Sequence, residues 1–293
     1  WGADESLMTW PPEYRPIRAI VLHHTVTSDG SVDPAAVVRA IYYYHAVTRE
    51  WGDIGYNYLI DAYGNIYEGR TGGVGVVGGH ALQYNWGSIG IAILGDYQEN
   101  NVPSAILTSL TNFAAWQCTD HMIPPTEQRY FVDKVLPTIM GHRDGSPSTV
   151  CPGDRAYALL PTIRAETLSK MAAIPPNMRL TSPANGETLR AVVTPALETS
   201  AAIQRVEYWV DGTLRATKTA PPYTWQWNTT EESDGAHQLR VVAHNGAGQR
   251  QQEVQVTVDN TAPSGSVSVP AWINTTNVPF ALNSPDATAV QFS

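Results

Sequence analysis

The stretch "IRAIVLHHTVTSDG" (residues 17–30) joins a short apolar run to two adjacent histidines. The run from Ile17 to Leu22 stops before turn-forming residues, and such a run predicts a buried strand. His23 and His24 stand at its end. Because neighbouring strand residues point to opposite faces, at most one of the two histidines faces a given site. A partner for that histidine must come from elsewhere in the chain.

The segments around this strand predict helices mixed with strands. The run "DPAAVVRAIYYYHAV" (33–47) predicts a helix with Asp33 as N-cap and with Val37, Ile41 and Tyr44 on one face. The other expected elements are a hairpin over 56–60 and 65–70, strands over 88–94 and 135–140, and helices over 103–121 and 154–171, the last kinked or restarted at Pro161. Together they indicate a mixed α/β domain, a mixed sheet flanked by about three helices.

The pattern becomes all-β near residue 175, after "IPPN" (174–177), which predicts a linker. Several short alternating runs follow: "RVEYWVDG" (205–212), "YTWQWN" (223–228), "HQLRVVAHN" (237–245) and "QEVQVTVD" (252–259). Their regular spacing predicts a β-sandwich, and the region resembles bacterial Ig-like domains. We therefore expect an α/β domain over 1–174, an Ig-like sandwich over 175–260, and a linker with the start of a further, incomplete β-module over 261–293.

Composition narrows the classes of function. The chain has 293 residues, 43% hydrophobic and 15% charged, which is ordinary for a globular protein of more than one domain. The sequence contains no run of 18 apolar residues, so no membrane span is expected. The net charge of −9 argues against nucleic acid as a partner, because phosphate binding needs a basic face. We expect a monomer.

The partner of His23 is expected in "MGHRDGSPSTVCPGDRAY" (140–157). There His142 follows a predicted strand, and Cys151 stands in a loop rich in glycine, proline and serine. Two imidazoles and a thiolate are ligands that zinc prefers, and three protein ligands leave a fourth position open for water. The spacing leaves another interpretation open, in which the histidines are polar residues at strand ends and the cysteine is structural.

Four motifs, in this order, resemble a known family of enzymes. They are "IVLHHT", "WGDIGYNYLIDAYGNIYEGR", "GGHALQYNWGSIGIAILGDY" and "GHRD…CPG". The resemblance runs from about residue 1 to 172 and is to the zinc amidases of the peptidoglycan recognition protein type. These are N-acetylmuramoyl-L-alanine amidases related to phage amidase lysozymes.

The resemblance implies roles for individual residues. By position in the motifs, His23, His142 and Cys151 would bind Zn²⁺, and Tyr56 and Thr149 would be catalytic. The implied reaction is hydrolysis of the amide between the lactyl group of N-acetylmuramic acid and L-alanine of the stem peptide. Arg70, His80 and Asn85 lie in stretches that line the peptide groove of related proteins and are expected to contact substrate. Trp51 and Arg143 are further candidates for substrate contact.

Two other questions stay open at this point. Cys118 and Cys151 could form one disulfide, but if Cys151 binds zinc as the resemblance implies, Cys118 is a buried helix residue. The alternative functions are a non-catalytic module that binds muropeptides and a surface adhesin whose main part is the β-region. We expect a secreted or cell-wall-associated protein, because of the implied substrate and the tandem β-modules.

Overall fold

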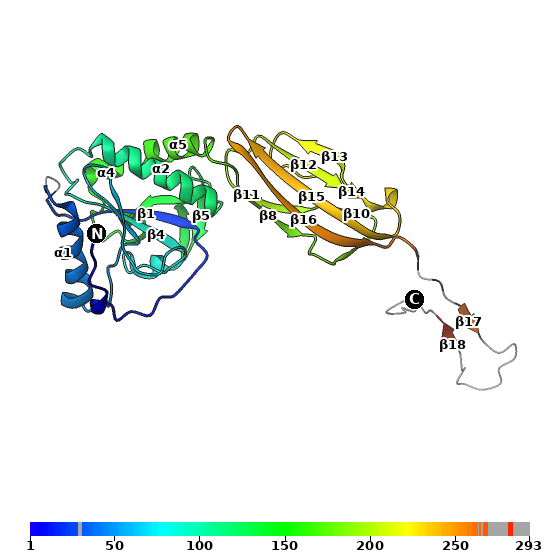
Figure 1. The fold of residues 1–293 in the computed structure, drawn as a ribbon, viewed down its shortest axis with the longest axis horizontal. Helices are drawn as coiled ribbons and strands as arrows, with labels where there is room; N and C mark the ends of the chain where they lie inside the picture. Colours follow the sequence, from blue (N-terminus) through cyan, green and yellow to red (C-terminus); the bar gives the residue numbers. More distant parts are fainter. Residues whose placement is uncertain (29–30, 263, 265, 269–280, 284–293) are drawn as a thin grey trace.

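The computed structural model describes residues 1–28, 31–262, 264, 266–268 and 281–283. The chain forms an α/β domain followed by an Ig-like β-domain, seen at the left and right of Figure 1. Among the described residues, no helix is long and apolar enough to cross a membrane.

The centre of the first domain is a mixed sheet of five strands in the order β3-β2-β4-β1-β7. Strand β1 lies between β4 and β7 and runs parallel to both, while β2 is parallel to β4 and antiparallel to β3. The bounds are β1 (Ala19–His24), β2 (Tyr58–Ile60), β3 (Ile66–Glu68), β4 (Ser88–Ile93) and β7 (Ile139–Gly141). The carboxyl ends of β1 and β7 therefore meet at one edge of the sheet.

Helices cover both faces of this sheet. Helices α2 and α5 pack on one face, where Ile91 of β4 belongs to their core cluster. Helix α1 packs on the opposite face, where Ala92, the residue after Ile91 in β4, belongs to the core cluster of α1. The helices are η1 (Glu5–Leu7), α1 (Pro34–Tyr43), the π-helical turn η2 (Tyr44–Thr48), η3 (Leu82–Asn85), α2 (Ser104–Asp120), α3 (His142–Gly145), α4 (Asp154–Ala158) and α5 (Leu160–Met171).

The two faces explain why His23 and His24 are not equivalent. His23 lies on the same face of β1 as Val21, which belongs to a cluster on the side of η3. His24 lies on the same face as Leu22, on the side of α2. On that side the Tyr97 N–H donates to His24 Nδ1 at 3.2 Å. The expectation that the two histidines point to opposite faces is confirmed.

One expected strand is wrong in detail. The run 135–140 is not a single strand, because it is divided between β6 (Lys134–Pro137) and β7. Strand β6 forms a separate hairpin with β5 (Gln128–Phe131), which the sequence analysis did not identify. Pro137 has no N–H to continue a ladder, and the chain changes sheets at Thr138, whose carbonyl accepts from Ile20 N–H at 2.8 Å.

The remaining α/β expectations agree with the structure. The hairpin of β2 and β3 and the helix at 104–120 form as expected. The third helix restarts, because α4 ends at Ala158 and Pro161 lies in the first turn of α5. A proline is tolerated there, since the first N–H groups of a helix have no intrahelical partner.

The second domain is a sandwich whose strands pair in antiparallel fashion, except that the short edge strand β9 is parallel to β16. Its larger sheet has the order β13-β12-β15-β16-β9, and side chains of β12 at Val206, Tyr208 and Val210 are fully buried while those between them are not. Because every second side chain of β12 is buried, one face of this sheet packs on the core of the domain. The elements are β8 (Met178–Ser182), β9 (Thr188–Leu189), β10 (Val192–Val193), β11 (Ala196–Thr199), β12 (Arg205–Val210), β13 (Thr213–Lys218), β14 (Trp227–Asn228), η4 (Thr229–Glu231), β15 (Gly235–Asn245) and β16 (Gly248–Val258).

The end of the chain contains one more pair of strands. Strands β17 (Ser266–Ser268) and β18 (Ala281–Asn283) pair in antiparallel fashion. The other residues of the expected further β-module, 269–280 and 284–293, lie outside the described residues. The domain limits at 174 and 260 stay a prediction.

Candidate metal centre

Adjacent parallel strands bring His23 and His142 together. Leu22 pairs with Gly141 in the register of β1 and β7, so the residues next to this pair, His23 and His142, lie at the same edge of the sheet. The two imidazole ring centroids are 4.6 Å apart. His142 begins the short helix α3, whose first turn is held by a hydrogen bond from Gly141 N–H to Asp144 at 2.9 Å.

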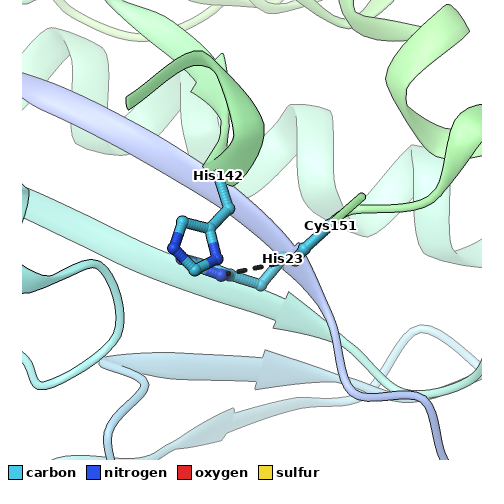
Figure 2. Close-up of side chains that lie close together, drawn as sticks. All are labelled: His23, His142 and Cys151. Carbon is cyan, nitrogen blue, oxygen red and sulfur yellow. Dashed lines mark hydrogen bonds between the residues drawn. The ribbon is translucent and has the colours of Figure 1, made fainter. Parts of the chain in front are cut away.

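The loop before α4 brings Cys151 to the histidines. The Arg143 N–H donates to the Cys151 carbonyl at 3.0 Å, which fastens this loop to α3. The Arg143 guanidinium also donates to the Val150 carbonyl, and to the Asp154 carboxylate at 2.7 Å. As a result Cys151 Sγ lies 3.6 Å from His23 Nδ1 (Figure 2).

The three side chains fit a zinc ion. One ligand atom each from His23, His142 and Cys151 lies within 4.8 Å of the others, and the side chains point toward one another from three separate segments (Figure 2). In a tetrahedral site with Zn–N near 2.0–2.1 Å and Zn–S near 2.3 Å, nitrogen and sulfur ligands are about 3.6 Å apart. The separation of His23 Nδ1 and Cys151 Sγ matches that edge. Both cysteines are free, so the thiol of Cys151 is available.

Burial sets the protonation of these groups. Desolvation, and then the neighbouring imidazoles of His80 and His142, hold the pKa of His23 well below its ordinary value. Burial also lowers the pKa of His142. Burial raises the pKa of the Cys151 thiol to about 12, against the opposing effects of a hydrogen bond from the His24 backbone and the charge of Arg143. Neutral imidazoles have free lone pairs, and a bound cation would displace the thiol proton.

Tyr56 and Thr149 lie beside these ligands. The Tyr56 ring centroid is 5.3 Å from that of His23, and burial, together with the nearby Cys151, raises the pKa of Tyr56 so that its phenol stays protonated. The Thr149 Oγ1 accepts the Cys151 N–H at 3.1 Å. A hydroxyl that accepts at its oxygen still has its own O–H to donate.

An apolar cavity of about 330 Å³ opens next to Tyr56. It lies between the end of β1 and helix α1, and its lining residues are Thr25, Thr27, Val37, Ala40, Ile41, Tyr44, His45 and Tyr56. A cavity of this size beside polar groups is the usual form of a small-molecule or peptide subsite.

His45 is a cavity residue that the sequence analysis did not single out. Its imidazole packs between two aromatic rings, with centroids 4.7 Å from Trp51 and 5.4 Å from Tyr56. Its Nδ1 accepts the Gly55 N–H at 3.1 Å, and burial lowers its pKa to about 4. The available signal was its position four residues after Ile41, on the same face of the predicted helix.

The five residues expected to contact substrate differ in exposure. Trp51 is 39% exposed, whereas Arg70 is 2% and His80 is 7% exposed. Asn85 Oδ1 accepts from His80 N–H at 2.8 Å, and the donors of Arg143 hold the loop before α4. Trp51 is thus more exposed than Arg70 and His80, although its ring also packs on His45. Substrate contact by any of the five stays a prediction.

Comparison with known proteins identifies the family. A model of the family described as N-acetylmuramoyl-L-alanine amidase matches residues 13–154, and a bacterial Ig domain model matches residues 176–241. Peptidoglycan-recognition protein SC2 of Drosophila simulans is 44% identical over 91 residues, which cover 30% of this chain and 48% of the relative. This match thus spans about half of the relative's length.

Two other relatives match over longer segments. Peptidoglycan recognition protein 1 of Bos taurus is 32% identical over 166 residues, covering 55% of this chain and 78% of the relative. A protein of Homo sapiens named N-acetylmuramoyl-L-alanine amidase is 33% identical over 151 residues, covering 50% of this chain and 24% of the relative. Through its α/β domain, the chain belongs to the family of N-acetylmuramoyl-L-alanine amidases and peptidoglycan-recognition proteins.

Proposed function

We propose that this chain is a zinc-dependent N-acetylmuramoyl-L-alanine amidase that cleaves the amide between the lactyl group of N-acetylmuramic acid and L-alanine. The observation that carries the proposal is the convergence of His23, His142 and Cys151, with ligand atoms within 4.8 Å of one another. Three such ligands leave a tetrahedral zinc with one open position, which is the pattern of catalytic zinc sites. The names of relatives that are amidases agree with this activity.

Two of the chain's own side chains would act on the reacting carbonyl and on the attacking water. Held by His23, His142 and Cys151, zinc would supply Lewis-acid polarisation of the carbonyl and a water whose pKa is lowered to about 7. Tyr56, which stays protonated, would donate its O–H to the carbonyl oxygen as negative charge develops there. Thr149 would donate its O–H beside the same oxygen or orient the attacking water, while the N–H of Cys151 holds its Oγ1 in place.

The apolar cavity next to Tyr56 would hold part of the substrate. Residues of helix α1 line one side of this cavity, and a substrate seated against them would exclude water, which strengthens hydrogen bonds in the site. Because peptidoglycan lies outside the cytoplasmic membrane, we also propose that the protein acts as a secreted or cell-wall-associated enzyme.

The test is the release of new free amino groups of L-alanine from purified peptidoglycan. Zinc-loaded wild type is compared with Cys151→Ser and with the matched control Cys118→Ala, because both cysteines are free and buried but only Cys151 is close to the histidines. We expect amines from wild type and Cys118→Ala, and none from Cys151→Ser.

A second function has support in the names of relatives, which include recognition proteins. In this alternative the same groove binds muropeptides without cleaving them. If the zinc-loaded wild type binds muropeptides and releases no amines, the recognition function replaces the amidase, and Tyr56 and Thr149 become binding residues.

A further inference from the structure

His80 is built into the fold directly behind His23. The His80 Nδ1 atom lies 3.0 Å from His23 Nε2, which is the ring nitrogen on the side away from Cys151. A methyl group on Gly78 or Gly90 would lie within 2.4 Å of the His80 ring, so only glycine at both positions leaves room for this imidazole. Asn85 fixes its backbone by accepting from His80 N–H at 2.8 Å.

The contacts of His80 favour one position for its ring proton. The Ser88 hydroxyl donates to the Tyr84 carbonyl, so its oxygen is left to accept at 3.5 Å from His80 Nε2. The tautomer that satisfies both contacts of His80 has the proton on Nε2 and the lone pair on Nδ1. In that arrangement His23 Nε2–H is the donor of the pair, and His23 Nδ1 is left as a lone pair on the side of Cys151.

We infer that His80 is a positioning residue for the metal, which holds His23 in the Nε2–H tautomer and aims its Nδ1 lone pair at the ion. The inference deepens the proposed function and rests on it for the presence of zinc. Histidines that bind metals generally donate their other N–H to a partner that fixes the ring and the tautomer. In most cases the partner is a carboxylate, a carbonyl or water, whereas here a neutral imidazole occupies that position.

The alternative roles of His80 fit its surroundings less well. If His80 bound the metal through Nδ1, this atom would have to turn away from His23 Nε2. Among the described residues, the cluster of possible metal ligands consists of His23, His142 and Cys151, without His80. A substrate contact would need an accessible face, but His80 is only 7% exposed and its ring is enclosed by Gly78 and Gly90.

The first experiment measures the affinity for Zn²⁺ alone, in the full chain, by competition with a chromogenic chelator. His80→Leu fills similar space and cannot accept a hydrogen bond, whereas Asn in His80→Asn presents Oδ1 near the position of Nδ1. We expect His80→Leu to bind Zn²⁺ about 10–100-fold more weakly, as is typical when the partner of a ligand is lost. We expect His80→Asn to recover most of that loss.

Two controls separate this effect from a general change of the fold. His121→Leu removes another largely buried histidine, at the end of α2, and should leave the affinity for Zn²⁺ unchanged. The second measurement records the ¹⁵N signals of the His23 ring in the metal-free protein, which differ between protonated and unprotonated nitrogens. We expect the proton on Nε2 of His23.

Each outcome decides the inference. Wild-type affinity in His80→Leu, or a proton on His23 Nδ1, overturns it, and so does an equal loss in His80→Leu and His80→Asn, because that loss reflects packing. A wild type with no affinity for Zn²⁺ overturns the inference together with the metal centre. If the wild type binds Zn²⁺ but releases no amines, only the amidase function fails and the role of His80 stands.

Discussion

His23 Nδ1 and Cys151 Sγ lie 3.6 Å apart, although 128 positions separate the two residues in the sequence. One atom stands at the end of β1 and the other in the loop before α4. The same distance is a ligand–ligand edge of a tetrahedral zinc site.

Removal of zinc is expected to destabilise the protein. A ligand that binds only the native state at 100 times its dissociation constant adds about 2.7 kcal/mol to the free energy of unfolding. A chelator should therefore lower the melting temperature of the wild type, and added Zn²⁺ should restore it. The measurement is calorimetry, and Cys151→Ser should show neither change. A chelator-sensitive melting temperature in Cys151→Ser would place the ion elsewhere.

Tyr56→Phe is expected to reduce hydrolysis by about 10²–10³-fold, the usual effect of removing one donor to a developing oxyanion. The ring that packs 5.3 Å from His23 remains, so the affinity for Zn²⁺ should not change. The rate is measured as amine release from peptidoglycan at saturating Zn²⁺. If the variant keeps the wild-type rate, the phenol O–H is not needed in the transition state.

Thr149→Val keeps the size of the side chain and removes its hydroxyl. The Cys151 N–H then loses the acceptor that lies at 3.1 Å, and the site loses one O–H donor. We expect hydrolysis to fall by about 10²–10³-fold. Thr149→Ser, which keeps the hydroxyl, is the matched control and should stay near the wild-type rate. Equal rates for the two variants would show that the Thr149 hydroxyl is not needed for hydrolysis.

The stability of the metal-free protein should fall as the pH falls from 7 to 4. His45 has a pKa of about 4 in the native state and an ordinary value of 6.5 when unfolded, because burial disfavours its charged form. Between these values the unfolded state binds more protons, so stability is greatest above pH 6.5 and is lost as the pH falls toward 4. One such histidine contributes at most about 1.4 kcal/mol per pH unit.

The variant His45→Asn tests this dependence. Asn can accept the Gly55 N–H as His45 Nδ1 does, and it does not titrate. Urea unfolding at several pH values should give a smaller pH slope for the variant than for the wild type. Identical slopes would show that His45 is not the group that titrates.

Residues 1–174 alone are expected to hydrolyse soluble muropeptides. The α/β domain has its own core clusters, and a separate cluster fills the Ig-like domain. The junction contains side-chain hydrogen bonds, from Asn177 to the Asp120 carbonyl at 2.8 Å and from Asn245 to the Ile174 carbonyl at 2.7 Å. The rate of the shortened chain is compared with that of the full chain. A fragment that folds and binds Zn²⁺ yet releases no amines would assign the β-region a part in the site.

Local patterns were sufficient to predict most of the elements. The apolar run before His23 and the caps of the helices depend on neighbouring residues, so they can be identified in the sequence. The division of 135–140 could not, because it depends on where Thr138 finds its partner Ile20 in another strand. The β5–β6 hairpin, by contrast, pairs residues that are close in the sequence, such as Phe131 and Lys134. It was missed because the single strand expected over 135–140 includes most of β6.

The sequence alone determined which residue types are present for the chemistry, two imidazoles and a thiol in motifs that resemble those of the family. Only the tertiary structure decided which atoms face one another. The parallel register of β1 and β7 brings His142 to His23, and the contacts of Arg143 bring Cys151 to both. The burial of His80 behind His23 also depends on packing, because two glycines from separate segments make the space for its ring. Such contacts depend on distances in space, which spacing along the chain does not determine.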